Sequence, residues 1–296
     1  MIDIYGEVTD RIIKELESGI IPWEKPWTGV MSGAISRTTG RAYSLINQIL
    51  LGKPGEYLTY KQAIAEGGNV RKGAKGRMVV FWKMLKRELK DDAGNTVRDA
   101  NGIPIAKTIP VLKYYTVFHI DDCENIEPKY KPEEMPNTAE TVERAEAAIQ
   151  DYTTRGKVTL VHEKQNRAFY RPSQHMVVLP LQEQFTETAE YYSTTFHELT
   201  HSTGHKSLLN RFTENAADAA FGSESYSKEE LVAEIGAATI LHELGIETKS
   251  SFRNSAAYIQ SWIAALKNDK RLIISAASKA EKAVKLILNI EQEAIA

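Results

Sequence analysis

A His-Glu-x-x-His segment, His197 to His201, constrains this chain more than any other feature of its sequence. On a helix, residues four apart lie on one face, so both imidazoles can be directed at the same cation. Zinc–nitrogen bonds of ~2.0 to 2.1 Å are within their reach, and the Glu198 carboxylate lies beside them. The segment therefore predicts half of a zinc peptidase site, in which Glu198 takes a proton from metal-bound water and returns it to the leaving amine.

The motif supplies two protein ligands, and a catalytic zinc site needs a third. A histidine six residues after His201 would complete one scheme, but Ser207 stands at that position. The other scheme takes a carboxylate from a second helix. The segment 227–234 is predicted to be that helix and carries acids four residues apart, Glu230 and Glu234. We expect Glu230 to bind the metal and Glu234 to orient an imidazole of the pair.

Other residues compete for these roles. Glu229 adjoins Glu230, while His205 and Asp218 lie between the motif and the second helix. Ser227 and Glu230 also have the spacing of a capping box, which would engage the Glu230 side chain with its own helix terminus. These alternatives stay open at the level of the sequence. The remaining histidines are expected to be structural residues; they are His119, His162, His175 and His242.

A chain of 296 residues is expected to hold two domains, because domains typically contain about 100 to 200 residues. The prolines at 128, 132 and 136 prevent a helix between them, and few residues near them can fill a core. We therefore place a first domain at 1–127, a linker at 128–138 and a second domain at 139–296. The expected fold class is α+β in both parts.

Hydrophobic periodicity predicts the elements of each part. Helices are expected at 5–19, 45–51, 137–152, 227–244, 255–266 and from 272 to the C-terminus, besides the helix that carries the motif. Strands are expected at 79–82, 114–120, 158–162, 168–171 and 176–179. The first two form an extended hairpin, and the last three form a small sheet. Gly19 and Gly204 are expected to end their helices, the latter in a left-handed conformation.

A basic block lies within a chain whose net charge is −2. Between Lys61 and Lys90 there are nine basic residues and two acidic ones. Such a block suits a polyanion, and nucleic acid is the usual polyanion in the cytoplasm. Three of the four tryptophans also fall in this first part. Because aromatic rings stack on unpaired bases and no helix-turn-helix or zinc-finger pattern is present, the sequence favours single-stranded nucleic acid.

The expected nucleic-acid contacts are basic and aromatic side chains of the first part. They are Arg37, Arg41, Tyr43, Lys61, Arg71, Lys72, Lys75, Arg77 and Trp82. The glycine-rich segment 67–77 could also cradle phosphate through backbone amides, although it lacks the ending of a P-loop. The alternative for each aromatic residue is a place in the core, which is at least as favourable for Trp82 within its apolar run.

Cellular location is predicted from what the chain lacks. No apolar run approaches the ~20 residues of a membrane span, and the first residues do not resemble a signal peptide. The chain holds one cysteine, Cys123, which excludes a disulfide framework within one chain. We therefore expect a cytoplasmic protein without a membrane partner.

Longer motifs extend over most of the chain. The first part contains Pro22-Trp23-x-x-Pro26-Trp27 and the segments 36–47, 57–63, 70–76 and 117–118; the second contains 197–201 and 226–237. The former resemble the N-terminal single-stranded DNA-binding domain of the ArdC family of plasmid antirestriction proteins, a domain that also begins certain plasmid primases. The latter resemble the zincin-like metallopeptidase domain that follows it in ArdC.

The resemblance implies a mobile-element protein that binds incoming single-stranded DNA and protects it from host restriction during conjugation. Segment 230–234 also resembles the Glu-x-x-Ala-Asp helix of related zincins, whose first Glu is a metal ligand; here Glu234 replaces the final Asp. Zinc is the expected metal, and manganese or cobalt can occupy the same ligands. Two other hypotheses remain: a DNA-coating protein with a structural or vestigial metal site, and a metallopeptidase that cleaves a host restriction or defence protein.

Overall fold

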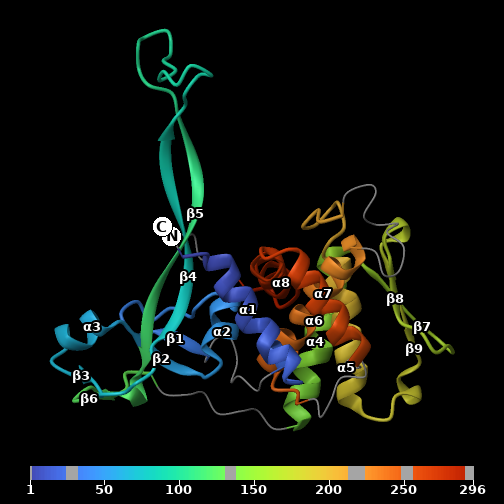
Figure 1. The fold of residues 1–296 in the computed structure, drawn as a ribbon. Coiled ribbons are helices and arrows are strands. Elements are labelled where there is room, and N and C mark those ends of the chain that lie inside the picture. Colours follow the sequence, from blue (N-terminus) through green and yellow to red (C-terminus); the bar gives the residue numbers. More distant parts are fainter. Residues whose placement is uncertain (1, 25–32, 131–137, 213–223, 248–255, 291–296) are drawn as a thin grey trace.

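The computed structural model describes residues 2–24, 33–130, 138–212, 224–247 and 256–290 (Figure 1). Its α-helices are α1 (Ile4–Glu17), α2 (Leu45–Leu51), α3 (Tyr60–Ala65), α4 (Thr138–Gly156), α5 (Thr188–Ser202), α6 (Glu224–Leu244), α7 (Ala256–Asn268) and α8 (Leu272–Ile287). Its strands are β1 (Ala34–Ser36), β2 (Gly55–Leu58), β3 (Asn69–Val70), β4 (Arg77–Glu88), β5 (Ala106–His119), β6 (Cys123–Glu124), β7 (Thr159–Glu163), β8 (Phe169–Arg171) and β9 (Met176–Pro180). The predicted α+β fold class is confirmed. Every described helix is too short or too polar to cross a bilayer.

α1 forms where the apolar period predicted it. The Asp3 carboxylate accepts a hydrogen bond from the Gly6 backbone N–H at 3.0 Å, which satisfies a donor in the first turn. Val8 and Leu16 belong to a buried face that packs toward α7. Gly19 takes a φ of 79° just beyond the helix, a left-handed conformation that glycine adopts without steric cost.

A four-stranded sheet in the order β1-β2-β5-β4 forms the centre of the first part. β4 and β5 pair antiparallel over their whole length and continue beyond the sheet as a two-stranded arm that projects from the body (Figure 1). At the far end the carboxylates of Asp91 and Asp99 each accept two backbone N–H bonds, which close two tight turns. The predicted hairpin is confirmed, and its strands are longer than predicted.

A three-stranded sheet in the order β7-β9-β8 supports the motif helix in the second part. β7 runs parallel to β9, and β8 runs antiparallel to it. α5 packs on β8 and β9, and its Phe196 and Leu199 share a core with Val177 and Leu179 of β9. α6 packs along α5 and α8. Two helices of the second part therefore face each other at the motif.

Residues on both sides of the expected linker share one hydrophobic core. α1, α2, the short helix η1 (Pro22–Glu24) and the base of the arm contribute from the first part, and α6, α7 and α8 contribute from the second. The buried rings of Trp23 and Trp262 meet edge-on with centroids 5.3 Å apart. Much of the predicted linker lies outside the described residues, as do Trp27, Asp218 and Asn137, the first residue of the helix predicted at 137–152.

Two predicted helix ends differ from the structure. The C-cap of α5 is Thr203 with a right-handed φ of −62°, so the left-handed ending predicted at Gly204 is wrong. Gly204 serves packing instead, because a Cβ there would lie 2.6 Å from the Phe212 ring. α6 begins three residues before Ser227, which places Ser227 inside the helix. A capping box between Ser227 and Glu230 is therefore excluded.

Candidate functional site

α5 and α6 bring three donor side chains together. The Nε2 atoms of His197 and His201 are 3.0 Å apart. The Glu230 carboxylate lies 3.5 Å from Nε2 of His197 and 3.2 Å from Nε2 of His201. His197 and Glu230 are buried and His201 is partly buried, and the donor atoms of the three residues all lie within 4.8 Å of one another. They are the three residues that the sequence predicted as metal ligands, and the structure brings them together.

The spacing of these donors suits a small divalent cation. In a tetrahedral site with metal–ligand bonds of about 2.0 to 2.1 Å, neighbouring ligand atoms are about 3.3 Å apart. The three separations here, 3.0, 3.2 and 3.5 Å, surround that value. Two imidazoles and a carboxylate are also a donor set that zinc and other divalent metals accept. The residues present therefore fit a metal ion.

A carboxylate also lies near the outer nitrogen of each imidazole. Glu234 is 3.3 Å from Nδ1 of His197, and Glu229 is 3.6 Å from Nδ1 of His201. Carboxylates in this position fix the orientation of a ligating ring and make its metal-facing nitrogen more basic. Glu229 lies at the outer nitrogen of His201 and is not among the three convergent donors, which favours Glu230 over Glu229 as the third ligand.

Arg211 holds Glu229 in this position, and the sequence contained no signal for it. Its guanidinium donates to the Glu229 carboxylate at 2.6 Å and to the Thr200 carbonyl at 2.9 Å. A further hydrogen bond goes to the Thr203 hydroxyl at the end of α5. Arg211 therefore connects the last turn of the motif helix to the residue that supports His201.

The electrostatics of the cluster favour a positive charge at its centre. Burial disfavours an ionised Glu230, but His201 and His197 hold the pKa of that carboxyl far below its ordinary value. Burial also opposes protonation of His201, yet the charge of Glu230 and hydrogen bonding to Glu229 raise its pKa to about 10. A divalent cation is the alternative to a proton for satisfying these carboxylates.

Glu198 lies between the two histidines on α5, with 4% of its surface exposed. Its charge contributes to raising the pKa of His201, which places the carboxylate close to the cluster. A carboxylate beside a metal site can accept a proton from an attacking water molecule and pass it to a leaving group. Glu198 therefore lies beside the three donor residues, and its role as a proton-transfer group stays a prediction.

Four other histidines have partners outside the cluster: His119, His162, His175 and His205. His119 reaches the Pro54 carbonyl through Nε2 at 2.8 Å, and His162 bonds to the Tyr191 hydroxyl at 3.0 Å. His205, an alternative ligand, stacks on His175 with ring centroids 4.0 Å apart. His205 therefore belongs to a separate aromatic contact.

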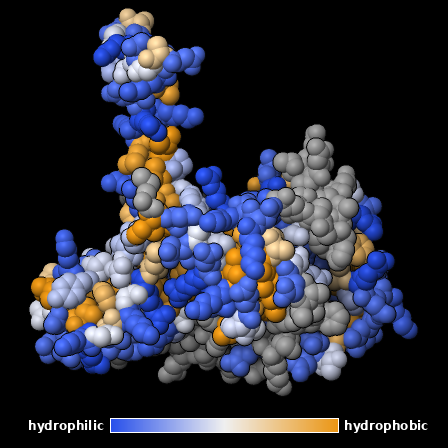
Figure 2. All heavy atoms as spheres, viewed as in Figure 1, coloured by the Kyte–Doolittle hydropathy of each residue, from blue (hydrophilic) through white to orange (hydrophobic). Residues whose placement is uncertain are grey.

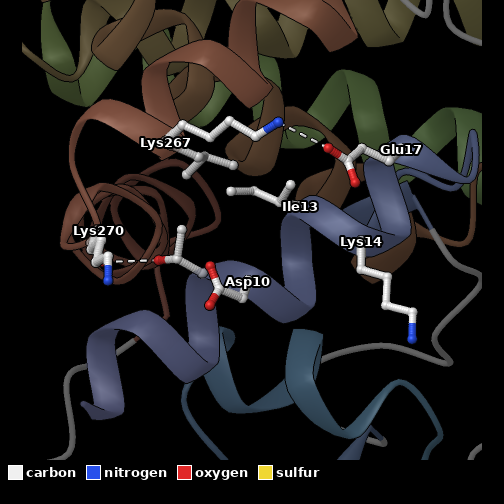
Figure 3. A pocket seen from close by; sticks show the side chains of 8 residues that line it. Asp10, Ile13, Lys14, Glu17, Lys267 and Lys270 are labelled. Atoms are coloured by element: carbon white, nitrogen blue, oxygen red, sulfur yellow. Dashed lines mark hydrogen bonds and ion pairs between the residues drawn. The ribbon is translucent and has the colours of Figure 1, made fainter.

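A surface cavity of about 330 Å³ between α1 and α7 is not part of the metal cluster (Figure 3). Its lining includes Lys267, which pairs with Glu17 at 2.9 Å, and Lys270, which pairs with Asp3 at 3.1 Å. None of the motif residues lines it. Its charges are largely paired across the two helices, so it gives no indication of a ligand.

The predicted nucleic-acid contacts differ in exposure. Exposed side chains are those of Arg41, Lys61, Arg71, Lys72, Lys75 and Trp82. Arg77 is half-buried and donates to the Leu51 carbonyl at 2.6 Å. Arg37 is 4% exposed and bound by the carboxylates of Glu56 and Glu66. Its burial makes Arg37 a structural residue of the first part, unavailable to a nucleic acid in this structure.

The fold and the site together define a protein with a zincin-like metallopeptidase part behind a distinct N-terminal part. Residues 143–279 match the family model of the zincin-like metallopeptidases, and residues 2–118 match that of the N-terminal domain of anti-restriction factor ArdC. The Mn(II)-bound crystal structure of the antirestriction ArdC protein from plasmid R388 is 35% identical, with a TM-score of 0.73. That match covers 97% of this chain and 98% of the other. The chain belongs to the ArdC family of antirestriction proteins, as the sequence motifs predicted.

Longer proteins carry a similar segment. Two DNA primases TraC of Escherichia coli are 39% and 38% identical over 98% and 97% of this chain. The chain spans 27% and 20% of their respective lengths. The metal-free crystal structure of the R388 protein matches this chain with the same TM-score of 0.73 as the Mn(II)-bound structure.

Proposed function

We propose that this protein protects incoming DNA from restriction by binding it as a single strand through the N-terminal part, and that it holds a divalent metal in a peptidase-like site. The convergence of His197, His201 and Glu230 beside Glu198 carries the second half of this proposal. The family match of residues 2–118 and the exposed cations of that part support the first half. A protein with this role would act in the cytoplasm.

The metal site would work through its own side chains in distinct roles. His197, His201 and Glu230 would hold the ion, which would supply Lewis-acid activation of water and of a peptide carbonyl. Glu198 would take the proton of the attacking water and deliver it to the leaving amine. Glu234 and Glu229 would keep the two imidazoles oriented. Zinc and manganese both suit this donor set, and a manganese ion is bound in the R388 protein.

A second function is favoured by the burial of the cluster. Glu198 and His197 are at most 4% exposed. A metal site buried in this way could hold α5 and α6 together as a structural site, without hydrolysing a peptide. In that case protection would come from coating the DNA. The two functions make opposite predictions for a variant that lacks only the proton-transfer group.

The decisive experiment measures conjugative transfer of an unmodified plasmid into a restricting host. Wild-type protein is compared with Glu198→Ala and with Glu183→Ala, which removes an exposed carboxylate outside the cluster, at matched expression. Metal content of each purified variant shows whether the ligands still work. Lost protection with retained metal in Glu198→Ala alone supports hydrolysis as the working step. Equal protection by all three proteins contradicts it and leaves DNA coating.

A further inference from the structure

The pairing register of the arm divides its side chains between two faces. Residues directly opposite each other in an antiparallel pair point to the same side. Phe81 pairs with Lys113, Lys83 with Val111, and Arg87 with Lys107. Since these β4 positions are separated by even numbers of residues, all of these side chains share one face. Trp82, the predicted aromatic contact, points to the other face.

Charge is distributed unequally between these faces. One face, which we call the basic face, carries Phe81, Lys83, Arg87, Lys107, Lys113 and Tyr115. From residue 79 to 88 and from 106 to 115 it holds four basic residues and no acidic one. The opposite face over the same span holds Lys86 and Glu88, which balance each other. The positive charge of the paired strands is therefore concentrated on the basic face.

The cations of the basic face also lie opposite one another without counterions. Arg87 and Lys107 are directly opposed across the two strands, and Lys83 is diagonal to Lys113. Like charges in directly opposed positions destabilise a sheet. All four side chains are exposed, and none of them takes part in an ion pair found among the described residues. A polyanion along this face would relieve the repulsion.

An aromatic pair begins the basic face at the base of the arm. The rings of Phe81 and Tyr115 lie 5.5 Å apart and are tilted by 57°, with 40% and 38% of each residue exposed. Tyr43 lies near Tyr115, which adds to the effect of burial in raising the pKa of the Tyr43 hydroxyl. Exposed Arg41 is two residues away along the chain. Figure 2 shows hydrophobic residues gathered along the stem of the arm and hydrophilic ones toward its end.

We propose that single-stranded nucleic acid lies along the basic face, with bases stacked on Phe81 and Tyr115 and phosphates on Lys83, Lys113, Arg87 and Lys107. This inference rests on the proposed single-strand binding and names its surface. Exposed rings next to cations are the recognition device for unpaired bases, whereas a duplex hides its base faces. The arm then binds through the face opposite to Trp82.

The first test removes charge from one face at a time in the full chain. Lys83→Gln with Lys113→Gln changes the basic face. Lys86→Gln with Lys90→Gln is the control in the same arm, because Lys86 points to the opposite face and Lys90 lies beyond the paired part of β4. Affinity for a fluorescein-labelled oligo-dT is measured over a range of salt. For single strands each lost phosphate contact lowers the salt slope by about 0.7, so the first pair should lower it by about 1.4 and weaken binding at least tenfold at about 0.1 M salt. The control pair should change neither.

The second test replaces one aromatic residue on each face of the arm. The sequence predicted Trp82 as the aromatic contact, whereas the pairing register assigns base stacking to Phe81. Phe81→Ala should weaken oligo-dT binding at least about fivefold, since stacking on one base is worth ~1 to 3 kcal/mol. Trp82→Ala should change it less than about twofold. Thermal unfolding of each variant confirms that the comparison is between folded proteins. A larger loss in Trp82→Ala than in Phe81→Ala overturns the assignment.

Failure of this inference can be told apart from failure of the proposed function. Absent or salt-insensitive binding by the wild-type protein, or a preference for duplex, overturns both. If wild-type protein binds oligo-dT but both arm pairs bind equally well, and Arg71→Gln with Lys72→Gln loses binding, the single-strand function stands and the basic face is wrong. Arm variants that change the sedimentation of the protein alone would make the arm a protein interface instead.

Discussion

At the scale of single residues, the difference between Glu229 and Glu230 decides how the metal is held. We predict that Glu230→Gln weakens metal binding by more than about 100-fold, because it removes a direct ligand. Glu229→Gln should cost only about 10- to 100-fold, the usual effect of losing a carboxylate that orients a ligating histidine. Competition with a chromophoric chelator measures both. Arg211→Gln should match Glu229→Gln, because Arg211 acts through that carboxylate.

The reverse order of losses would make Glu229 the ligand. The sequence was sufficient to choose the histidines, since their spacing on a helix follows from geometry alone. It predicted Glu230 from the spacing of two acids on a second helix, and a resemblance supported that choice over Glu229. It missed Arg211, whose contact with Glu229 depends on tertiary packing. It also assigned Arg37 to the nucleic-acid surface, whereas the structure buries this residue against Glu56 and Glu66. The sequence could not show this burial, because it depends on tertiary packing.

His119 provides a prediction about pH. Burial lowers the pKa of its imidazole below the ordinary value of 6.5, while Nε2 bonds to the Pro54 carbonyl and Nδ1 accepts from the Asp121 N–H. The unfolded chain therefore binds a proton at a pH where folded His119 remains neutral. Its stabilisation is complete above pH 6.5 and is lost as the pH falls from there toward the lower pKa of the folded state.

The measurement compares wild-type protein with His119→Gln by urea unfolding at about pH 7.5 and about pH 5.5. The free energy of unfolding should fall less with acidification in the variant, whatever its stability at the higher pH. An equal fall in both proteins would show that His119 does not contribute. Because other histidines and carboxylates titrate in both proteins, only the difference between the two profiles is informative.

At the scale of elements, Gly236 sets the distance between α5 and α6. A Cβ on Gly236 would lie 2.7 Å from Cγ2 of Thr200, one residue before the metal-site His201. Helix propensity alone would make Gly236→Ala stabilising by about 1 kcal/mol. We predict a net loss instead, because overpacking a buried contact costs about 1 to 3 kcal/mol and pushes Glu230 away from the histidines.

Thermal unfolding and metal titration of Gly236→Ala test this prediction. The second substitution Thr200→Ser removes the nearest carbon atom and should restore part of both stability and metal affinity. A variant with a raised melting temperature and unchanged metal affinity would show that the helices can move apart without consequence. Thr200→Ser alone is the control for loss of that methyl group.

The elements themselves were predictable where one face is buried. α2 was predicted at its observed limits, and the three short strands of the second part were predicted to within one residue. These predictions were possible because an element that is buried on one side has apolar residues at regular intervals. β4 and β5 were predicted too short, since beyond residue 82 both faces of the arm meet solvent and little periodicity remains. The basic face depends on pairing register, which could not be read from either strand alone.

At the scale of the whole molecule, the predicted boundary does not separate two independent cores. Trp23 and α1 pack against Trp262, and the same core includes Leu231 and Ile235 from the helix that carries Glu230. The sequence could show the prolines between the parts but not the packing of α1 against α7, which joins residues more than 200 positions apart. Stability should therefore be shared between the two parts.

Substitution of one tryptophan tests this sharing. We predict that Trp23→Ala destabilises the protein by about 3 to 5 kcal/mol, because it leaves a cavity in the common core. Trp82→Ala is the matched control; as an exposed residue on the arm it should change stability by less than about 0.5 kcal/mol. Guanidinium unfolding followed by circular dichroism measures both. A small effect of Trp23→Ala would contradict a common core.

Metal binding should consequently protect the part of the molecule that does not contain the metal site. A ligand that binds only the folded state adds about 2.7 kcal/mol to the free energy of unfolding at 100 times its dissociation constant. Two denaturant midpoints are compared, one for the loss of oligo-dT binding and one for the loss of helicity. If both parts unfold as one unit, saturating zinc or manganese must raise both midpoints by the same amount. If the parts unfold separately, metal will shift the loss of helicity while the loss of DNA binding stays in place. Glu230→Gln, which lacks a metal ligand, should show neither shift and so excludes a direct effect of the ion on the DNA.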